Sequence, residues 1–228
     1  MALFLTQGLS ESTSQKHLSP EDAIVALLEM YGDMDKLQIP LHENLGDALI
    51  KTIKAVWNMI IRICEALLNI IKRAIFAVAD MAKGNQRVKV SKAETDRWNA
   101  VLAACKKHYA DVKNTGHKKM EDWNPIAKRI KDDVTSANKL SSRGDTDEVP
   151  AQMLKGFLEN VQTNLTTLEG IAKSFDSSVE KMGMRLATVE GREQAKVWES
   201  QGRTAHEMAV VVTSVAKSVM SHIPRGTK

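Results

Sequence analysis

Histidine and cysteine, the side chains that most often bind metals or act as nucleophiles, are few in this chain and are not spaced for either task. The 228 residues include two cysteines and six histidines, namely His17, His42, His108, His117, His206 and His222. No two of these histidines lie four residues apart, as ligands on one helix face would, and Cys64 and Cys105 form no CxxC pair. Cys105 precedes His108 by three residues, which we interpret as a contact at a helix edge rather than a nucleophile with its base.

Other sequence patterns of enzymes are also missing. There is no serine nucleophile elbow, no glycine-rich phosphate loop and no pair of carboxylates in an apolar setting. Cys64 and Cys105 both fall on apolar helical positions, which indicates reduced core residues and a reducing compartment. We therefore predict a non-enzymatic protein with no catalytic residue, no metal, no cofactor and no small-molecule substrate.

Positive charge is concentrated in the middle of the chain. Residues 1–48 contain eight acidic and two basic side chains, residues 49–140 carry a net charge of +10, and residues 141–228 are neutral. The basic middle supplies the candidate contacts to phosphate groups or lipid, which are Lys72, Arg73, Lys106, Lys107, Lys118 and Lys119. No DNA-reading motif accompanies them and acidic residues are interleaved, so at most weak, sequence-independent DNA contact is expected.

Two short motifs match recognition sequences without indicating a function. Arg143-Gly144-Asp145 is an integrin-binding tripeptide, but glycine and aspartate are common in turns. Asn164-Leu165-Thr166 is a glycosylation sequon, yet residues 1–10 lack the basic leader of a signal peptide. The most apolar stretch, residues 55–82, is interrupted by charged residues and is not expected to cross a bilayer alone. We expect a protein that is not secreted by a signal peptide.

Long helices must position these side chains. Only 12 glycines and 5 prolines occur, aromatic residues make up 4%, and strand patterning is essentially absent. These features predict an all-α fold, an elongated bundle of about six helices, two of which are long and carry heptad repeats. The expected regions are an acidic leader with a short helix (1–48), a basic helical region (49–140), a loop (141–150) and a C-terminal helical, coiled-coil region (151–228).

The two heptad repeats are the strongest structural signal. Apolar residues recur at steps of four and three between Leu49 and Lys83, and again between Leu154 and Val189. The residues expected to carry association along these two seams are Trp57, Ile60, Leu67, Ile71, Leu158, Leu165, Phe175 and Leu186.

Three interpretations of the first seam remain open. The helix that carries it is the central helix of a bundle, an oligomer seam between identical chains, or a membrane-surface helix in which Trp57 and Phe76 enter the acyl boundary. Glu65 and Asp80 interrupt the basic face and weigh against the membrane alternative.

Cap and breaker residues set the remaining boundaries. Ser19 and Pro20 predict the start of a short helix that stops at Gly32, and the first seam helix should end at Gly84 and Asn85. Residues 85–90 are predicted to be a basic linker, followed by a capping box from Ser91 to Glu94. A helix over about 120–140 follows, in which Pro125 disturbs the start. Within the second seam, close packing or a bend is expected at one or more of its glycines, Gly156, Gly170 and Gly183, and a separate final helix is expected after Gly202.

Ser19-Pro20-Glu21 suggests a further hypothesis. An acidic leader ahead of a rigid helical body resembles the packaged internal head proteins of large tailed bacteriophages, whose propiece is removed after a small residue, any residue, then Glu. The resemblance implies that cleavage after Glu21 releases a propiece of residues 1–21 and places the basic body beside DNA inside a head. Ser178-Val179-Glu180 and Gly191-Arg192-Glu193 match the same pattern.

The sequence and this resemblance therefore predict a structural or assembly protein, expected in a virion or the host cytoplasm, that associates with itself or with other structural proteins through helical seams. The alternatives are a membrane-active amphipathic protein, such as an ejected or pore-associated factor, and a packaged protein that contacts DNA without sequence specificity.

Overall fold

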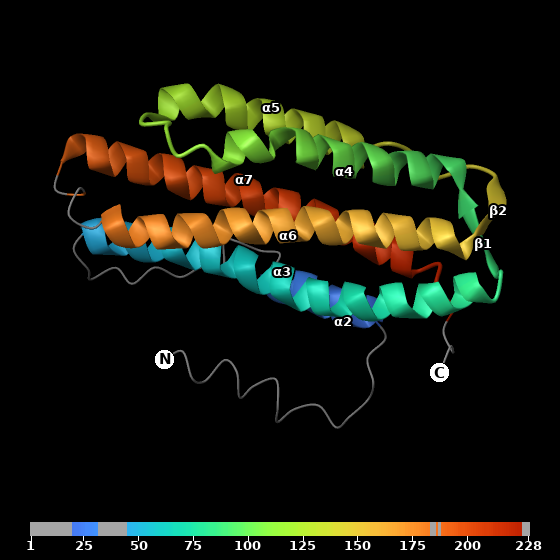
Figure 1. Ribbon diagram of the computed structural model, residues 1–228. Helices are drawn as coiled ribbons and strands as arrows, with labels where there is room; N and C mark the ends of the chain where they lie inside the picture. Colours follow the sequence, from blue (N-terminus) through green and yellow to red (C-terminus); the bar gives the residue numbers. More distant parts are fainter. Residues whose placement is uncertain (1–19, 32–44, 183–185, 187, 225–228) are drawn as a thin grey trace.

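The computed structural model describes residues 20–31, 45–182, 186 and 188–224, and these form an all-α bundle with one small sheet (Figure 1). The predicted fold class is confirmed. Six helices and two strands are described, with these bounds: α2 Pro20–Tyr31, α3 Leu45–Lys83, β1 Arg87–Ser91, α4 Lys92–Lys113, α5 Met120–Asn138, β2 Thr146–Pro150, α6 Ala151–Met182 and α7 Val189–Met220. One hydrophobic cluster draws on all six helices, so the expected regions on either side of residue 141 share a single core.

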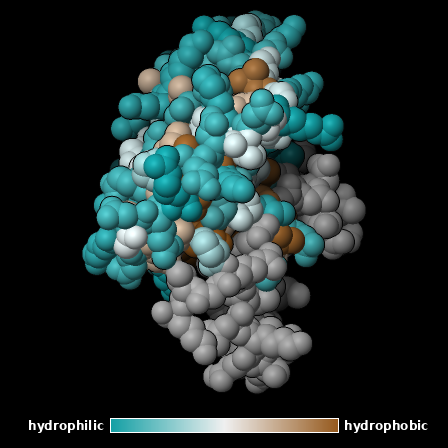
Figure 2. Space-filling view, turned by 90° about the vertical axis from the view of Figure 1, so that its right-hand side faces the viewer, coloured by the Kyte–Doolittle hydropathy of each residue, from teal (hydrophilic) through white to brown (hydrophobic). Residues whose placement is uncertain are grey.

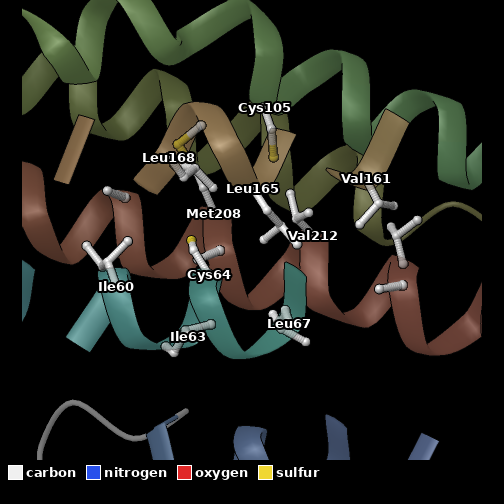
Figure 3. Packing of buried hydrophobic residues seen from close by; sticks show 14 of the residues in the cluster. Ile60, Ile63, Cys64, Leu67, Cys105, Val161, Leu165, Leu168, Met208 and Val212 are labelled. Carbon is white, nitrogen blue, oxygen red and sulfur yellow. The ribbon is translucent and has the colours of Figure 1, made fainter. Parts of the chain in front are cut away.

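The two heptad-bearing helices pack against each other within the chain. α3 and α6 run antiparallel, so that Trp57 near the start of α3 stacks on Phe175 near the end of α6, with ring centroids 4.2 Å apart. At the opposite end, the backbone N–H of Ala151 donates to the carbonyl oxygen of Gln86 at 3.0 Å. Figure 3 shows the middle of this core, where Cys64 and Leu67 of α3 lie among residues of α4, α6 and α7.

Helix α7 fills the groove beside α3 and α6, and a glycine permits its closest approach. Phe175 meets Trp198 of α7 edge-on, with centroids 5.6 Å apart. A Cβ atom built on Gly202 would lie 2.6 Å from Val56 Cγ1 and 3.2 Å from Trp57 Cε2. The first distance is shorter than real Cβ contacts, so any other residue at this contact between α7 and α3 would force Val56 or the helices to shift.

The prediction of a separate final helix after Gly202 is wrong, because α7 is one helix from Val189 to Met220 and Gly202 is buried in its middle. The predicted inner face, from Ala205 to Val219, is buried as expected. The second seam is interrupted instead: α6 ends at Met182, next to Gly183 in the sequence, and Val189 is 70% exposed. Glycine is a poor helix former, which agrees with a helix end at this point.

The glycines inside the second seam do not mediate close packing. A Cβ atom on Gly156 or Gly170 would meet no other atom within 4 Å. Both residues are on the exposed side of α6, so the expectation of close packing holds for neither. Gly183 lies outside the described residues.

Two segments predicted to lack regular structure form an antiparallel pair of strands. β1 replaces most of the expected linker, and β2 replaces the second half of the expected loop 141–150. Val88 pairs with Val149, and Val90 and Ser91 continue the register against Asp147 and Thr146. Val88 and Val90 are buried on one face of β1, an alternation that favours a strand but spans too few residues to stand out in the sequence.

The predicted cap residues Ser91 and Asn85 lie at helix ends as expected, whereas Glu94, the second half of the predicted capping box, accepts from Ser218 on α7. Ser91 Oγ accepts from the backbone N–H of Glu94 at 3.1 Å and caps α4. Asn85 adopts a φ of 50° after α3, and the N–H groups of Asn85 and Gln86 donate to the carbonyls of Ala82 and Met81 in a Schellman arrangement. α2 begins at Pro20 as predicted and buries Ile24 fully, whereas its expected cap Ser19 and the connector 33–44 lie outside the described residues.

Candidate association surface

The eight residues predicted to form association seams lie inside the chain. Trp57, Ile60, Leu67 and Ile71 of α3 are fully buried, as are Leu158, Leu165 and Phe175 of α6, and Leu186 is 6% exposed. In this structure the two seams pack against each other and against α7 within the chain, and their side chains are buried there.

The candidate phosphate or lipid contacts divide into two groups. Lys107 is already paired, because its Nζ lies 2.8 Å from Asp133 Oδ2. The other five are exposed and form no ion pair among the described residues: Lys72, Arg73, Lys106, Lys118 and Lys119. They lie on α3, on α4 and in the α4–α5 connection, so the fold does not gather them into one site.

His108 is buried and is the centre of a polar network between α4 and α5 whose other members reach the surface. Its Nε2 lies 2.9 Å from Asp133 Oδ2 and its Nδ1 lies 3.2 Å from Asp111 Oδ2. Arg129 donates to Asp111 at 3.0 Å, as Lys107 does to Asp133.

The same network shifts the pKa of Asp133 below its ordinary value of 3.8, chiefly through the hydrogen bond from Lys107 and then through that from His108. Opposite charges and donors favour the ionised carboxylate. The arrangement balances charge between two helices and leaves no ring nitrogen of His108 open to a substrate.

A second polar cluster joins the start of α4 to the end of α7. Trp98 Nε1 donates to Ser218 Oγ at 3.0 Å, and Ser218 Oγ donates to Glu94 Oε1 at 2.7 Å. His222 Nε2 lies 3.2 Å from Glu94 Oε2, and its ring meets Trp98 edge-on. Glutamate stands between the serine and the histidine here, so the imidazole is not placed to take the serine proton as a catalytic base would.

The two cysteines lie in the same core without reactive surroundings. Burial raises the pKa of both Cys64 and Cys105 to about 12, and for Cys64 the nearby carboxylates of Glu169 and Glu65 add to the effect. Such thiols are protonated at neutral pH and are poor nucleophiles. Both are free, as the sequence predicted.

Asn164, the acceptor residue of the glycosylation sequon, faces the interior. Its Oδ1 accepts from the Tyr109 hydroxyl at 2.6 Å, and its Nδ2 donates to the Asn160 carbonyl at 2.9 Å. A glycan cannot be attached to a buried amide that is engaged in this way. Arg143, Gly144 and Asp145 are exposed in the connection before β2, as expected of the tripeptide.

The three matches to the cleavage pattern occupy different settings. Ser19 lies outside the described residues, and Glu21 is the second residue of α2. Val179 is fully buried in α6, and Gly191 is buried in the first turn of α7. A protease that binds extended backbone would have to unfold α6 or α7 to reach the last two matches.

One cavity of the described surface lies beside the basic α4–α5 connection. This cavity, of about 480 Å³, lies between Lys118 and Lys119 and the start of α7 at Thr188 and Gly191. Thr188 Oγ1 accepts from the Gly191 N–H at 3.0 Å, so the helix cap already uses this oxygen. Within the described residues, no group of three or more His, Cys, Asp or Glu side chains is arranged to hold a metal ion, and no helix is long and apolar enough to cross a membrane.

Sequence reasoning missed the polar contacts between helices. Glu94 and His222 are 128 residues apart and carry no joint signal, and the pairing of His108 with Asp133 depends on how α4 and α5 turn toward each other. Comparison with known proteins adds nothing to this geometry: no family model, no curated protein and no solved structure matches the chain.

Proposed function

We propose that this protein is a non-enzymatic structural or assembly component that works through the outer surface of a self-contained helical bundle. The observation that carries the proposal is the mutual burial of its two long seams. α3 has 39 residues, which at 1.5 Å per residue gives a body about 60 Å long. The stacked Trp57 and Phe175 and the close contact at Gly202 fix its helices relative to one another.

Polar side chains between the helices support a structural role. His108 joins α4 to α5, Glu94 and Ser218 join α4 to α7, and Tyr109 and Asn164 join α4 to α6. Histidine, glutamate, serine and tyrosine serve as acids, bases or nucleophiles in enzymes, but here each is engaged by a neighbouring helix. Networks of this kind stabilise one arrangement of helices when their members are satisfied.

The partners we propose are other structural proteins or further copies of the chain. Because the seams are occupied, association uses the exposed faces of the helices. On the face seen in Figure 2, hydrophilic residues cover most of the described surface and hydrophobic ones form small separate patches. Such a surface favours contacts that combine a few apolar side chains with a polar rim.

A place inside a virion is the specific form of the proposal, and it rests on the resemblance in layout to packaged phage head proteins. One feature of the fold agrees with processing after Glu21, because cleavage there leaves Ile24, the fully buried residue of α2, with the mature chain. All three matches to the pattern include helical residues, of α2, α6 or α7, so local unfolding has to expose each of them to a protease.

Mass mapping of the protein isolated from its source organism tests this proposal. We expect a mature N-terminus at Asp22 and co-purification with the proteins of a particle. A chain that retains residues 1–21 and sediments apart from every particle would contradict it. Weak DNA binding that falls steeply with added salt would favour the packaged, DNA-contacting variant, and no binding at low salt would count against that variant.

A further inference from the structure

The outward face of α3 combines exposed cations with the most exposed large apolar side chain among the described residues. Phe76 is 73% exposed. Arg62, Lys72 and Arg73 are exposed on the same helix. At 100° per residue, these four side chains fall within an arc of about 100° on α3. They form one stripe roughly 20 Å long, which we call the α3 stripe.

The structure removes the objection that acidic residues interrupt this stripe. Glu65 Oε1 lies 3.1 Å from Lys173 Nζ of α6, and Asp80 Oδ1 lies 2.9 Å from Lys83 Nζ one turn further along α3. Asp80 is thus paired with a lysine outside the α3 stripe, and Glu65 shares Lys173 with Glu169. The pKa of Lys173 is raised by its hydrogen bonds to Glu169 and Glu65, which keeps that lysine charged.

The three cations of the α3 stripe keep their charge uncompensated. No ion pair joins Arg62, Lys72 or Arg73 to an acidic group in the part of the chain that the structure describes. Counted together with Glu65, Glu169 and their shared lysine, Lys173, the local charge is about +2, and a phenyl ring stands among the cations. Half-buried apolar side chains flank the stripe on both sides, including Leu68 on one side and Ile70 on the other.

We propose that the α3 stripe is a binding surface for an anionic lipid bilayer. Lysine and arginine side chains extend to lipid phosphates while an aromatic ring enters the boundary with the acyl chains, as in amphipathic helices that lie in the plane of a membrane. A nucleic acid would match the charge equally well. It offers no apolar phase for Phe76, however, and the stripe has no second aromatic ring with which to form a stacking platform.

The proposed contact differs from the membrane helix that the sequence suggested. Trp57, which was expected to enter the lipid, is fully buried against Phe175. The α3 seam also stays in the protein core. The bundle therefore binds as a folded body through one face, and no helix needs to leave the core to reach the lipid.

Co-sedimentation with vesicles tests the proposal on the full-length chain. We expect binding to vesicles that contain phosphatidylglycerol, none to pure phosphatidylcholine, and release by added salt. Phe76→Ser should weaken partition at least tenfold, the lower end of what burying a phenylalanine contributes. Lys72→Gln and Arg73→Gln should each weaken it about fivefold, since each cation near an anionic surface contributes about 1 kcal/mol.

A matched control separates this surface from overall charge. Lys128→Gln/Lys131→Gln removes two exposed lysines of α5 and lowers the net charge as much as Lys72→Gln/Arg73→Gln does. We expect the control to change binding less than twofold. All of the altered side chains are exposed, so circular dichroism and unfolding midpoints should match those of the unaltered protein.

Several outcomes would overturn the proposal. These are equal binding to both kinds of vesicle, no binding to either, or an equal loss in the α5 control. A protein that ignores vesicles but binds DNA through Lys72 and Arg73 would assign the α3 stripe to nucleic acid instead. None of these results bears on the mature N-terminus, so the proposed structural role is tested independently of the membrane proposal.

Discussion

Gly202 offers the sharpest test of how the helices are fixed. Gly202→Ala adds one methyl group where a Cβ atom would lie 2.6 Å from Val56 Cγ1 and 3.2 Å from Trp57 Cε2. Gly170→Ala adds the same methyl group to α6 where no atom lies within 4 Å. The pair therefore separates the effect of packing from the effect of helix propensity.

The two substitutions should have opposite effects on the free energy of unfolding. Alanine in an open helical position raises stability by about 0.5–1 kcal/mol, which is the expectation for Gly170→Ala. Overpacking costs about 1–3 kcal/mol, so Gly202→Ala should be less stable than Gly170→Ala by roughly this amount. For a chain of this length each kcal/mol corresponds to about 2–4 °C in midpoint.

Urea and thermal unfolding followed by far-ultraviolet circular dichroism measure the difference. The reasoning would be refuted if Gly202→Ala stabilised the protein as much as Gly170→Ala does. A double substitution checks the assigned contact, because Val56→Ala removes the atom nearest to the new methyl group. Gly202→Ala should then cost less in the Val56→Ala background, with a coupling energy of about 0.5–3 kcal/mol.

Three further outcomes test the core, the thiols and the polar network. Leu67→Ala should lower the free energy of unfolding by about 2–5 kcal/mol without changing the sedimentation coefficient; an altered oligomeric state at unchanged stability would show that the seam binds another chain. Cys64 and Cys105, with pKa values raised to about 12 by burial, should react with a thiol reagent at neutral pH only after unfolding, and fast labelling of the native protein would contradict that burial. The lowered pKa of Asp133 means that its ionised form adds stability above pH 3.8, and that this stability is lost as the pH falls through the native pKa. The difference in unfolding midpoint between the unaltered protein and Asp133→Asn should therefore shrink below about pH 4, and a difference that is constant with pH would rule out this contribution.

Periodicity made the long helices predictable. An apolar repeat of 3.5 residues indicates a helix that packs one face against an apolar partner. The nine seam positions on α3 from Ile53 to Met81 are buried, as this repeat predicts. Local chemistry also placed the cap at Ser91 and the end of α3 near Asn85. Helix periodicity and caps depend on residues close together in the sequence, which is why they can be predicted from it.

Features that depend on tertiary packing were not predictable. Glycine usually disfavours a helix, so the sequence suggested a helix boundary at Gly202. In the structure Gly202 instead lets α7 pack closely against α3, which only the positions of Val56 and Trp57 show. Glu94 has the spacing of a capping-box residue, but its carboxylate accepts from Ser218 on α7. Five-residue strands such as β1 leave too short an alternation to separate them from a linker.

The β1–β2 pair has a consequence for the order in which the chain folds. α4 and α5 lie entirely between these strands, and the backbone hydrogen bond from Ala151 to Gln86 closes the segment that contains them. Bringing α3 and α6 together directly would close a loop of roughly 60 residues. If the helical hairpin and the two strands form first, that loop shrinks to a few residues, which saves about 2–3 kcal/mol of closure entropy. The two strands would then pair early in folding. In that case, substitutions at Val88 and Val149 should give φ-values near one.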